Sequence, residues 1–285
     1  MTTLRPLQAD LRIAARFLDG TDESPALEII QVKGKGESAY PPIVCLHGAS
    51  SGAWMWEEFL RVLGARGRPA AALSLRGHGR SDGRGELKSA TLDDYSQDVL
   101  RAFSEFDEPP ILIAHSLGSL IAGRFLGRTA MRALVLLAPL PPEGMFWLSL
   151  RLLAIEPTAS FEAARLMLGV EPRVPGPLKD YIFSPRFSSA DIDRHISRMV
   201  PEGMRLLMEA HLPQPVMPAY LAGVPALVIG GDKDRLVPAE LFVRTAIFHG
   251  ADCHIAEGFG HLLHVEPRGS EIAHATLDWL EERGL

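Results

Sequence analysis

The sequence predicts an α/β fold with a doubly wound, mostly parallel sheet that has antiparallel strands at its N-terminal edge. Apolar runs at residues 43–46, 111–113 and 226–229 lack the polar alternation of a half-exposed strand, so we interpret each as a strand buried on both faces. Segments with helical periodicity lie between these runs. Strands that alternate with helices in this way form parallel βαβ units, with helices on both faces of the sheet.

The first 139 residues supply most of the predicted sheet. Two strand-like segments at residues 11–18 and 26–32 are joined by a polar turn, so we expect an antiparallel pair. Thr91 and Asp94 resemble a capping box, which marks the start of a helix. The remaining expected elements of this part are strand 43–46, a helix from about 53 to 63, strand 70–75, strand 111–113, a helix from Leu117 and strand 133–138.

The alternation stops between residues 140 and 222, where helix-like pieces are separated by prolines and no strand is evident. A helical segment that directly follows a strand ending beside a site is typical of a lid. We therefore expect a core made of residues 1–139 and 223–285, and a helical cap made of residues 140–222. The second part of the core should contain strand 226–229, a helix that begins at Pro238, strand 253–256 and an amphipathic helix with Ile272, Thr276, Trp279 and Leu280 in phase.

The composition is that of an ordinary globular protein, with 47% hydrophobic and 22% charged residues among 285. A net charge of −6, without a Lys/Arg cluster, argues against a nucleic-acid partner and against an anionic membrane surface. No window approaches the roughly 18 apolar residues of a membrane span, and the N-terminus lacks an apolar signal core. We therefore expect a cytoplasmic protein without stable membrane insertion. Cys45 and Cys253 lie in apolar runs and are expected to be small buried core residues, with no metal spacing around them.

The stretch Ala114-His115-Ser116-Leu117-Gly118 connects a predicted strand to a predicted helix through a sharp bend. Residues two positions on either side of such a bend must be small, and Ala114 and Gly118 meet this need around Ser116. This is the small-x-Ser-x-small form of a nucleophile elbow. The serine oxygen then stands at a helix amino terminus, where backbone N–H groups stabilise negative charge. Serine is also a preferred helix N-cap, so the motif alone leaves a structural role open.

Three further loops with reactive side chains follow predicted strands, at the sheet edge where ligands and catalytic groups gather. They are His47-Gly48-Ala49 after strand 43–46, Gly231-Asp232-Lys233-Asp234 after strand 226–229, and Gly258-Phe259-Gly260-His261 after strand 253–256. The serine therefore precedes an acidic loop, which precedes a histidine loop, as in a Ser…Asp…His triad on this kind of sheet. Asp232 and Asp234 both remain candidates for the acid at this point.

Together with Arg76-Gly77-His78-Gly79-Arg80-Ser81, these motifs resemble the α/β-hydrolase superfamily over nearly the whole chain outside the cap. The resemblance implies that Ser116 is the nucleophile, His261 the base and Asp234 the acid, since Asp234 matches the Gly-x-x-Asp spacing of the family. It also implies oxyanion donors at the N–H groups of Ala49 and Leu117, with no cofactor and no metal. The chain departs from the family at Ala114, in place of the first elbow glycine, at Ser119, in place of a glycine, and at Ser74, where many members have Asp.

The remaining histidines near these motifs are expected to have supporting roles. His47 and His115 should hold the oxyanion loop and the elbow by hydrogen bonding, and His78 belongs to a structural loop. A metal pair of His261 and His264 would need further ligands, so we interpret His264 as a packing residue.

These observations predict a serine hydrolase of carboxylic esters with a hydrophobic acyl or aromatic group, acting through an acyl-enzyme. The expected partner is a small-molecule substrate, and the expected state is a monomer or a homodimer. The apolar cap run that contains Phe146 and Trp147 is expected to line the substrate pocket. Two alternatives remain: hydrolysis of a carbon–carbon bond in a diketone by the same triad, and a ligand receptor without catalysis on the same fold.

Overall fold

A single eight-stranded sheet in the order β1-β2-β4-β3-β5-β6-β7-β8 runs through the computed structural model, which describes residues 12–22, 24–33, 38–167, 170 and 176–285. The strand β1 pairs with β2, and β2 with β4, in antiparallel register, whereas all other neighbours are parallel. This confirms the predicted fold class. The strands are β1 (Arg12–Leu18), β2 (Leu27–Lys33), β3 (Ile43–Leu46), β4 (Ala70–Leu73), β5 (Ile111–His115), β6 (Ala133–Leu137), β7 (Ala226–Gly231) and β8 (Asp252–Ala256).

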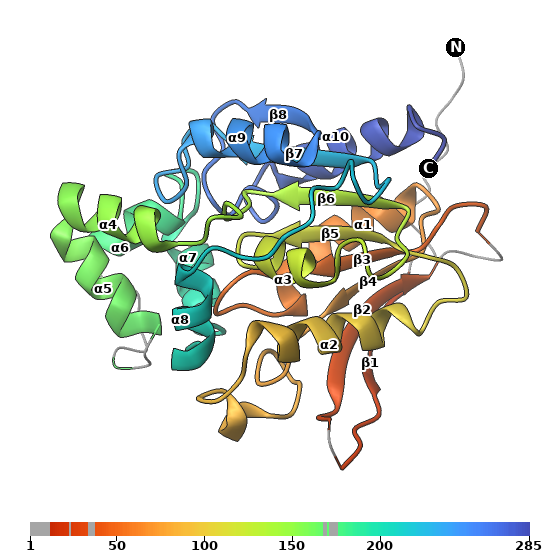
Figure 1. Cartoon of the computed structure of the whole chain (residues 1–285), viewed down its shortest axis with the longest axis horizontal. Coiled ribbons are helices and arrows are strands. Elements are labelled where there is room, and N and C mark those ends of the chain that lie inside the picture. The colour runs from red at the N-terminus through yellow and green to blue at the C-terminus, as the bar shows by residue number, and fades with distance from the viewer. Residues whose placement is uncertain (1–11, 23, 34–37, 168–169, 171–175) are drawn as a thin grey trace.

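Helices cover both faces of the sheet (Figure 1). The helices α2 and α3 pack together on one face, and α1 packs with α10 on the other. Thr91 and Asp94 form the predicted capping box at the start of α2, which fixes where that helix begins. The bounds are η1 (Ala53–Trp56), α1 (Glu57–Ala65), η2 (Arg84–Glu86), α2 (Leu92–Phe103), α3 (Gly118–Phe125), α9 (Ala239–His249) and α10 (Gly269–Glu281).

Between β6 and β7 the described chain is helical and contains no strand. These helices gather beyond the carboxyl ends of the parallel strands, on the left of Figure 1. They are α4 (Phe146–Ile155), α5 (Pro157–Met167), α6 (Gly176–Ile182), α7 (Ser189–Ile196) and α8 (Met204–His211).

Two expectations about local structure were wrong. Cys45 is buried in β3, but Cys253 is exposed, because β8 is the edge strand of the sheet and its first three residues are all exposed to solvent. Pro238 is the N-cap of α9 in extended conformation, so the helix begins one residue later than expected. None of the described helices has the length and apolarity needed to cross a membrane.

Candidate active site

Ser116 lies in the tight turn between β5 and α3, with a φ of 51°. This left-handed conformation is uncommon for a residue with a side chain and costs energy, so the surrounding structure must enforce it. The Ser116 N–H donates to the Leu137 carbonyl of β6 at 3.0 Å, and its carbonyl accepts the Ser119 N–H at 2.9 Å. The hydroxyl of Ser119 also donates to the carbonyls of Ser116 and Leu140, so this departure from the family pattern contributes hydrogen bonds to the elbow.

Two glycines let the loop after β3 lie directly against this turn. A Cβ atom on Gly48 would stand 2.9 Å from the Cβ atom of Ser116, and one on Gly118 would stand 3.1 Å from the His47 carbonyl oxygen. Any larger residue would push the loop and the elbow apart. The small residues that the sequence places here therefore set the distance between the serine and the predicted oxyanion loop.

The structure brings Ser116, His261 and Asp234 into one hydrogen-bonded chain. Ser116 Oγ lies 2.9 Å from His261 Nε2, and His261 Nδ1 lies 2.7 Å from Asp234 Oδ2. All three residues are buried. The second carboxylate oxygen of Asp234 accepts the N–H groups of Leu236 and Val237, both at 2.9 Å. A carboxylate held in this way fixes the His261 proton on Nδ1, which leaves Nε2 to accept the serine proton.

Asp232 lies apart from this chain. Its carboxylate accepts the Gly258 N–H and pairs with Lys233 at 2.8 Å. The Lys233 contact and the Gly258 hydrogen bond lower the pKa of Asp232, although burial alone would raise it. Asp232 therefore holds the turn that precedes His261 without touching the imidazole.

The N–H groups of Ala49 and Leu117 have no hydrogen-bond acceptor within the part of the chain that the structure describes. Both residues line the same cavity as Ser116. Unsatisfied amides beside a nucleophile are the arrangement that stabilises an oxyanion. The geometry is therefore compatible with the predicted pair of donors.

Three histidines packed around the site, His47, His115 and His264, are kept neutral by burial, which lowers the pKa of each. His47 donates from Nδ1 to the Gly48 carbonyl and accepts the Leu75 N–H at Nε2, and burial lowers its pKa to about 3. His115 donates from Nε2 to the His261 carbonyl, which ties the elbow strand to the histidine loop. His264 stacks on Trp56, and burial lowers its pKa to about 3, as expected of a packing residue.

Ser74, which lies just before the Arg76-Gly77-His78 loop, works together with a carboxylate from β2. Its hydroxyl donates to Glu28 Oε2 at 2.8 Å, and the same oxygen accepts the Arg80 N–H at 2.9 Å. Glu28 Oε1 accepts Arg80 Nε at 2.6 Å. Glu28 thus supplies the negative charge that anchors the loop around His78.

Glu202 was not singled out from the sequence, yet its buried carboxylate joins four parts of the chain. It accepts the Ser50 N–H at 2.7 Å and the Tyr95 hydroxyl at 3.0 Å, and it lies 3.2 Å from His78 Nε2. Val200 also donates its N–H to the Ser50 carbonyl at 3.1 Å. The segment between α7 and α8 therefore holds the residue next to Ala49 from both sides.

We expect Glu202→Ala to destabilise the protein by about 3–5 kcal/mol, because it leaves the buried His78 without its ionic partner. Burial alone lowers the pKa of His78, but Glu202 outweighs it and raises that pKa above its ordinary value. The contribution of the His78–Glu202 ion pair to the free energy of unfolding is therefore fully present below about pH 6.5. It disappears as the pH rises through the raised pKa of His78. Urea denaturation of the wild type and of Glu202→Ala at several pH values measures the difference in the free energy of unfolding.

Tyr95→Phe is the matched control, since it removes one hydroxyl from the same carboxylate and should cost only about 1 kcal/mol. A loss for Glu202→Ala no larger than that of Tyr95→Phe would show that the ion pair contributes nothing.

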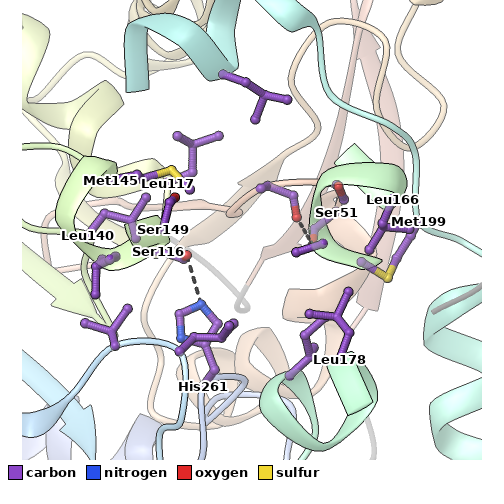
Figure 2. Close-up of a pocket in the computed structure, with 18 of the residues that line it drawn as sticks. Ser51, Ser116, Leu117, Leu140, Met145, Ser149, Leu166, Leu178, Met199 and His261 are labelled. Atoms are coloured by element: carbon purple, nitrogen blue, oxygen red, sulfur yellow. Dashed lines mark hydrogen bonds between the residues drawn. The ribbon is translucent and has the colours of Figure 1, made fainter. Parts of the chain in front are cut away.

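The site opens into a cavity of about 600 Å³, and none of the described residues that line it is Asp, Glu, Lys or Arg. Ligand pockets for small molecules have this size and this apolar character. Figure 2 shows Ser116 and His261 at one side of the cavity, near Leu140 and Met145, with Leu166, Leu178 and Met199 across the open space.

The helix α4 contributes a different face to the cavity than expected. Phe146 and Trp147 are 53% and 66% exposed and do not line the cavity. The lining residues from this helix and its N-cap are Met145, Leu148, Ser149 and Leu152, which follow the spacing of one helical face. The prediction that this segment borders the cavity agrees with the structure, whereas the choice of the two aromatic residues was wrong.

Among the described residues, no group of three or more His, Cys, Asp or Glu side chains is arranged to hold a metal ion.

The chain matches the sequence model of the Alpha/beta hydrolase family over residues 43–275. Methylesterase 2 of Arabidopsis thaliana is 33% identical over 79 residues, which cover 27% of this chain and 30% of that protein. The matched stretch thus spans less than a third of this relative. A protein of Mycobacterium phage D29 named as a non-heme haloperoxidase is 28% identical over 269 residues, which cover 85% of this chain and 90% of that protein.

Solved structures share the fold at low sequence identity. The bromoperoxidase of Bacillus anthracis matches with a TM-score of 0.70 and 15% identity, over 94% of this chain and 100% of that one. The epoxide hydrolase VrEH1 of Vigna radiata matches with a TM-score of 0.67 and 17% identity, over 95% of this chain and 98% of that one. Similarity at this level describes the architecture and not the reaction.

Proposed function

The chain belongs to the α/β-hydrolase family, and on this premise we propose that it hydrolyses carboxylic esters with a hydrophobic acyl or aromatic group, with Ser116 as nucleophile. The observation that carries the proposal is the hydrogen-bonded chain from Ser116 through His261 to Asp234, at the wall of a cavity whose described lining is mostly apolar. The partial likeness to a methylesterase supports an ester as the substrate.

In this mechanism, Ser116 Oγ attacks the carbonyl carbon while His261 Nε2 takes the serine proton. The carbonyl oxygen becomes an oxyanion, which the N–H groups of Ala49 and Leu117 stabilise. His261 then gives its proton to the leaving alcohol, and the acyl group remains on Ser116. A water molecule, deprotonated by the same imidazole, attacks the acyl-enzyme and releases the acid.

A serine at the elbow separates this proposal from enzymes of similar fold that form their ester on a carboxylate. The elbow residue of this chain is Ser116 and not a carboxylate. The likeness to the epoxide hydrolase therefore concerns the architecture only. We also propose that residues 140–222 act as a cap over a core of residues 1–139 and 223–285. This division is supported by the helices α4 to α8 beyond the strand ends, several of which contribute lining residues.

The test is a series of 4-nitrophenyl esters of increasing acyl length, run beside an aromatic diketone. Burying one methylene is worth about 0.8 kcal/mol, so kcat/KM should rise up to a few-fold per carbon until the cavity is full, and then fall. Efficient cleavage of the diketone, with slow turnover of every ester, would favour carbon–carbon bond hydrolysis instead.

We expect Leu148→Ala and Leu152→Ala to move the optimum of this series towards longer acyl groups, because both side chains line the cavity. Phe146→Ala and Trp147→Ala are the matched controls on the outer face of the same helix, and they should leave the optimum unchanged. The readout is the acyl length of maximal kcat/KM, with melting temperatures to detect lost packing. A shift in the controls but not in the lining variants would contradict the orientation of α4.

A further inference from the structure

The apolar cavity carries a Ser–His pair that the proposed mechanism does not use. Ser149 of α4 and His211 of α8 both line the cavity, and Ser149 Oγ lies 2.9 Å from His211 Nε2. Figure 2 places Ser149 on the same side of the cavity as Ser116 and Met145. Polar groups in an otherwise apolar pocket are the ones that fix the orientation of a ligand.

The direction of this hydrogen bond follows from the backbone. His211 Nδ1 lies 2.7 Å from the Leu207 carbonyl oxygen, which can only accept, so Nδ1 carries the proton. In the neutral imidazole Nε2 is then an acceptor, and the proton shared with Ser149 comes from the serine hydroxyl. Because that hydroxyl hydrogen is committed to His211, Ser149 can offer a ligand only the lone pairs of its oxygen.

Two other polar side chains of the cavity, His195 and Ser51, also offer a ligand only hydrogen-bond acceptors. His195 donates Nδ1–H to the Asp191 carbonyl at 2.7 Å, and burial lowers its pKa, so its Nε2 is a neutral acceptor. Ser51 donates its hydroxyl to the Ala49 carbonyl at 3.0 Å and likewise keeps only acceptor capacity. In contrast, the backbone donors of the cavity, Ala49 and Leu117, lie where the ester carbonyl would react.

We propose that the natural substrate is a neutral ester whose hydrophobic part carries a hydroxyl group, and that Ser149, oriented by His211, accepts the hydrogen bond of that hydroxyl. This inference rests on the proposed ester hydrolysis and specifies its substrate class. A cationic donor is disfavoured because, among the described lining residues, there is no carboxylate to offset the cost of burying its charge. An ether or ketone at the same place would bring its acceptor oxygen against the oxygen of Ser149, and no hydrogen bond could form between them.

The test uses 4-nitrophenyl esters of phenylalkanoic acids with two to four methylene groups. Each acid is compared with its ring-hydroxylated form and its ring-methoxylated form, at the meta and para positions. At the chain length and position that reach Ser149, kcat/KM should be about tenfold or more higher for the hydroxyl than for the methoxy ester. Ser149→Ala should remove most of this ratio, because the hydroxyl ester should lose far more kcat/KM than the methoxy ester or the unsubstituted ester.

His211→Leu provides a second, opposite prediction. Without its acceptor, the Ser149 hydroxyl can turn its hydrogen towards the ligand, so the methoxy ester should improve relative to the hydroxyl ester. A ratio near one at every position in the wild type, or a hydroxyl preference that survives in both variants, would overturn the proposal. Equal loss for all esters in Ser149→Ala would also overturn it, because that pattern indicates a purely structural hydrogen bond.

Binding measurements separate a failure of this inference from a failure of ester hydrolysis. Methyl ketone analogues of the same three compounds can be titrated calorimetrically into the Ser116→Ala variant, which lacks the proposed nucleophile. Tighter binding of the hydroxylated ketone, abolished by adding Ser149→Ala, supports the recognition site even if no ester is turned over. Equal affinities for the three ketones at every position overturn it even if esters are hydrolysed.

Discussion

The Ser116→Ala variant is expected to fold normally and to retain about one part in 10⁴ or less of the wild-type ester turnover. The nucleophile and its base act as a unit, so losing the hydroxyl removes the whole covalent route. Folding should survive because the contacts that hold the elbow come from the backbone of Ser116 and from Ser119, which the substitution leaves in place. Steady-state kinetics with the best ester of the series, together with a melting temperature, measure both effects.

Ser96→Ala is a matched control, because Ser96 is a buried serine whose hydroxyl donates to the Leu92 carbonyl outside the cavity. It should keep wild-type turnover. A serine-directed phosphonate should add to Ser116 in the wild type, as found by peptide mass spectrometry. Activity of Ser116→Ala near that of the wild type, or a label on another residue, would remove Ser116 as the nucleophile.

The fold and the proposed catalytic residues could be predicted because they depend on local patterns. A strand that turns into a helix through Ala114-His115-Ser116-Leu117-Gly118 has few conformations available, and parallel strands place their loops at a common edge. Ser116, Asp234 and His261 follow the strands β5, β7 and β8, so the parallel topology brings them to this common edge. Their contacts, at 2.9 Å and 2.7 Å, need only that topology and the small residues around it.

The parts that could not be predicted depend on tertiary contacts. Phe146, Trp147 and Leu148 are adjacent in a helix whose only polar residues are Ser149 and Arg151, so periodicity gives little indication of which face meets the cavity. Glu202 is 152 residues from Ser50, and no local motif connects them. The exposure of Cys253 follows from the edge position of β8, which an apolar run does not reveal.

Asp234→Asn is expected to lower turnover by a factor on the order of 10³ to 10⁴. An amide has one acceptor oxygen, whereas Asp234 accepts from His261 Nδ1 on one side and from the Leu236 and Val237 N–H groups on the other. If the amide oxygen stays with the two backbone donors, the NH₂ group faces Nδ1. The imidazole then carries its proton on Nε2 and cannot accept the proton of Ser116.

Asp232→Asn is the comparison that decides the assignment, and its cost should remain below about tenfold. Its amide oxygen can still accept the Gly258 N–H, so only the pairing with the exposed Lys233 is lost, and exposed ion pairs contribute little. Turnover of both variants should be measured on one ester, with melting temperatures as the check on folding. A larger loss for Asp232→Asn would transfer the role of the acid to Asp232. Comparable losses at both positions, accompanied by lower melting temperatures, would mean that the two carboxylates support the loops and that neither orients His261 for catalysis.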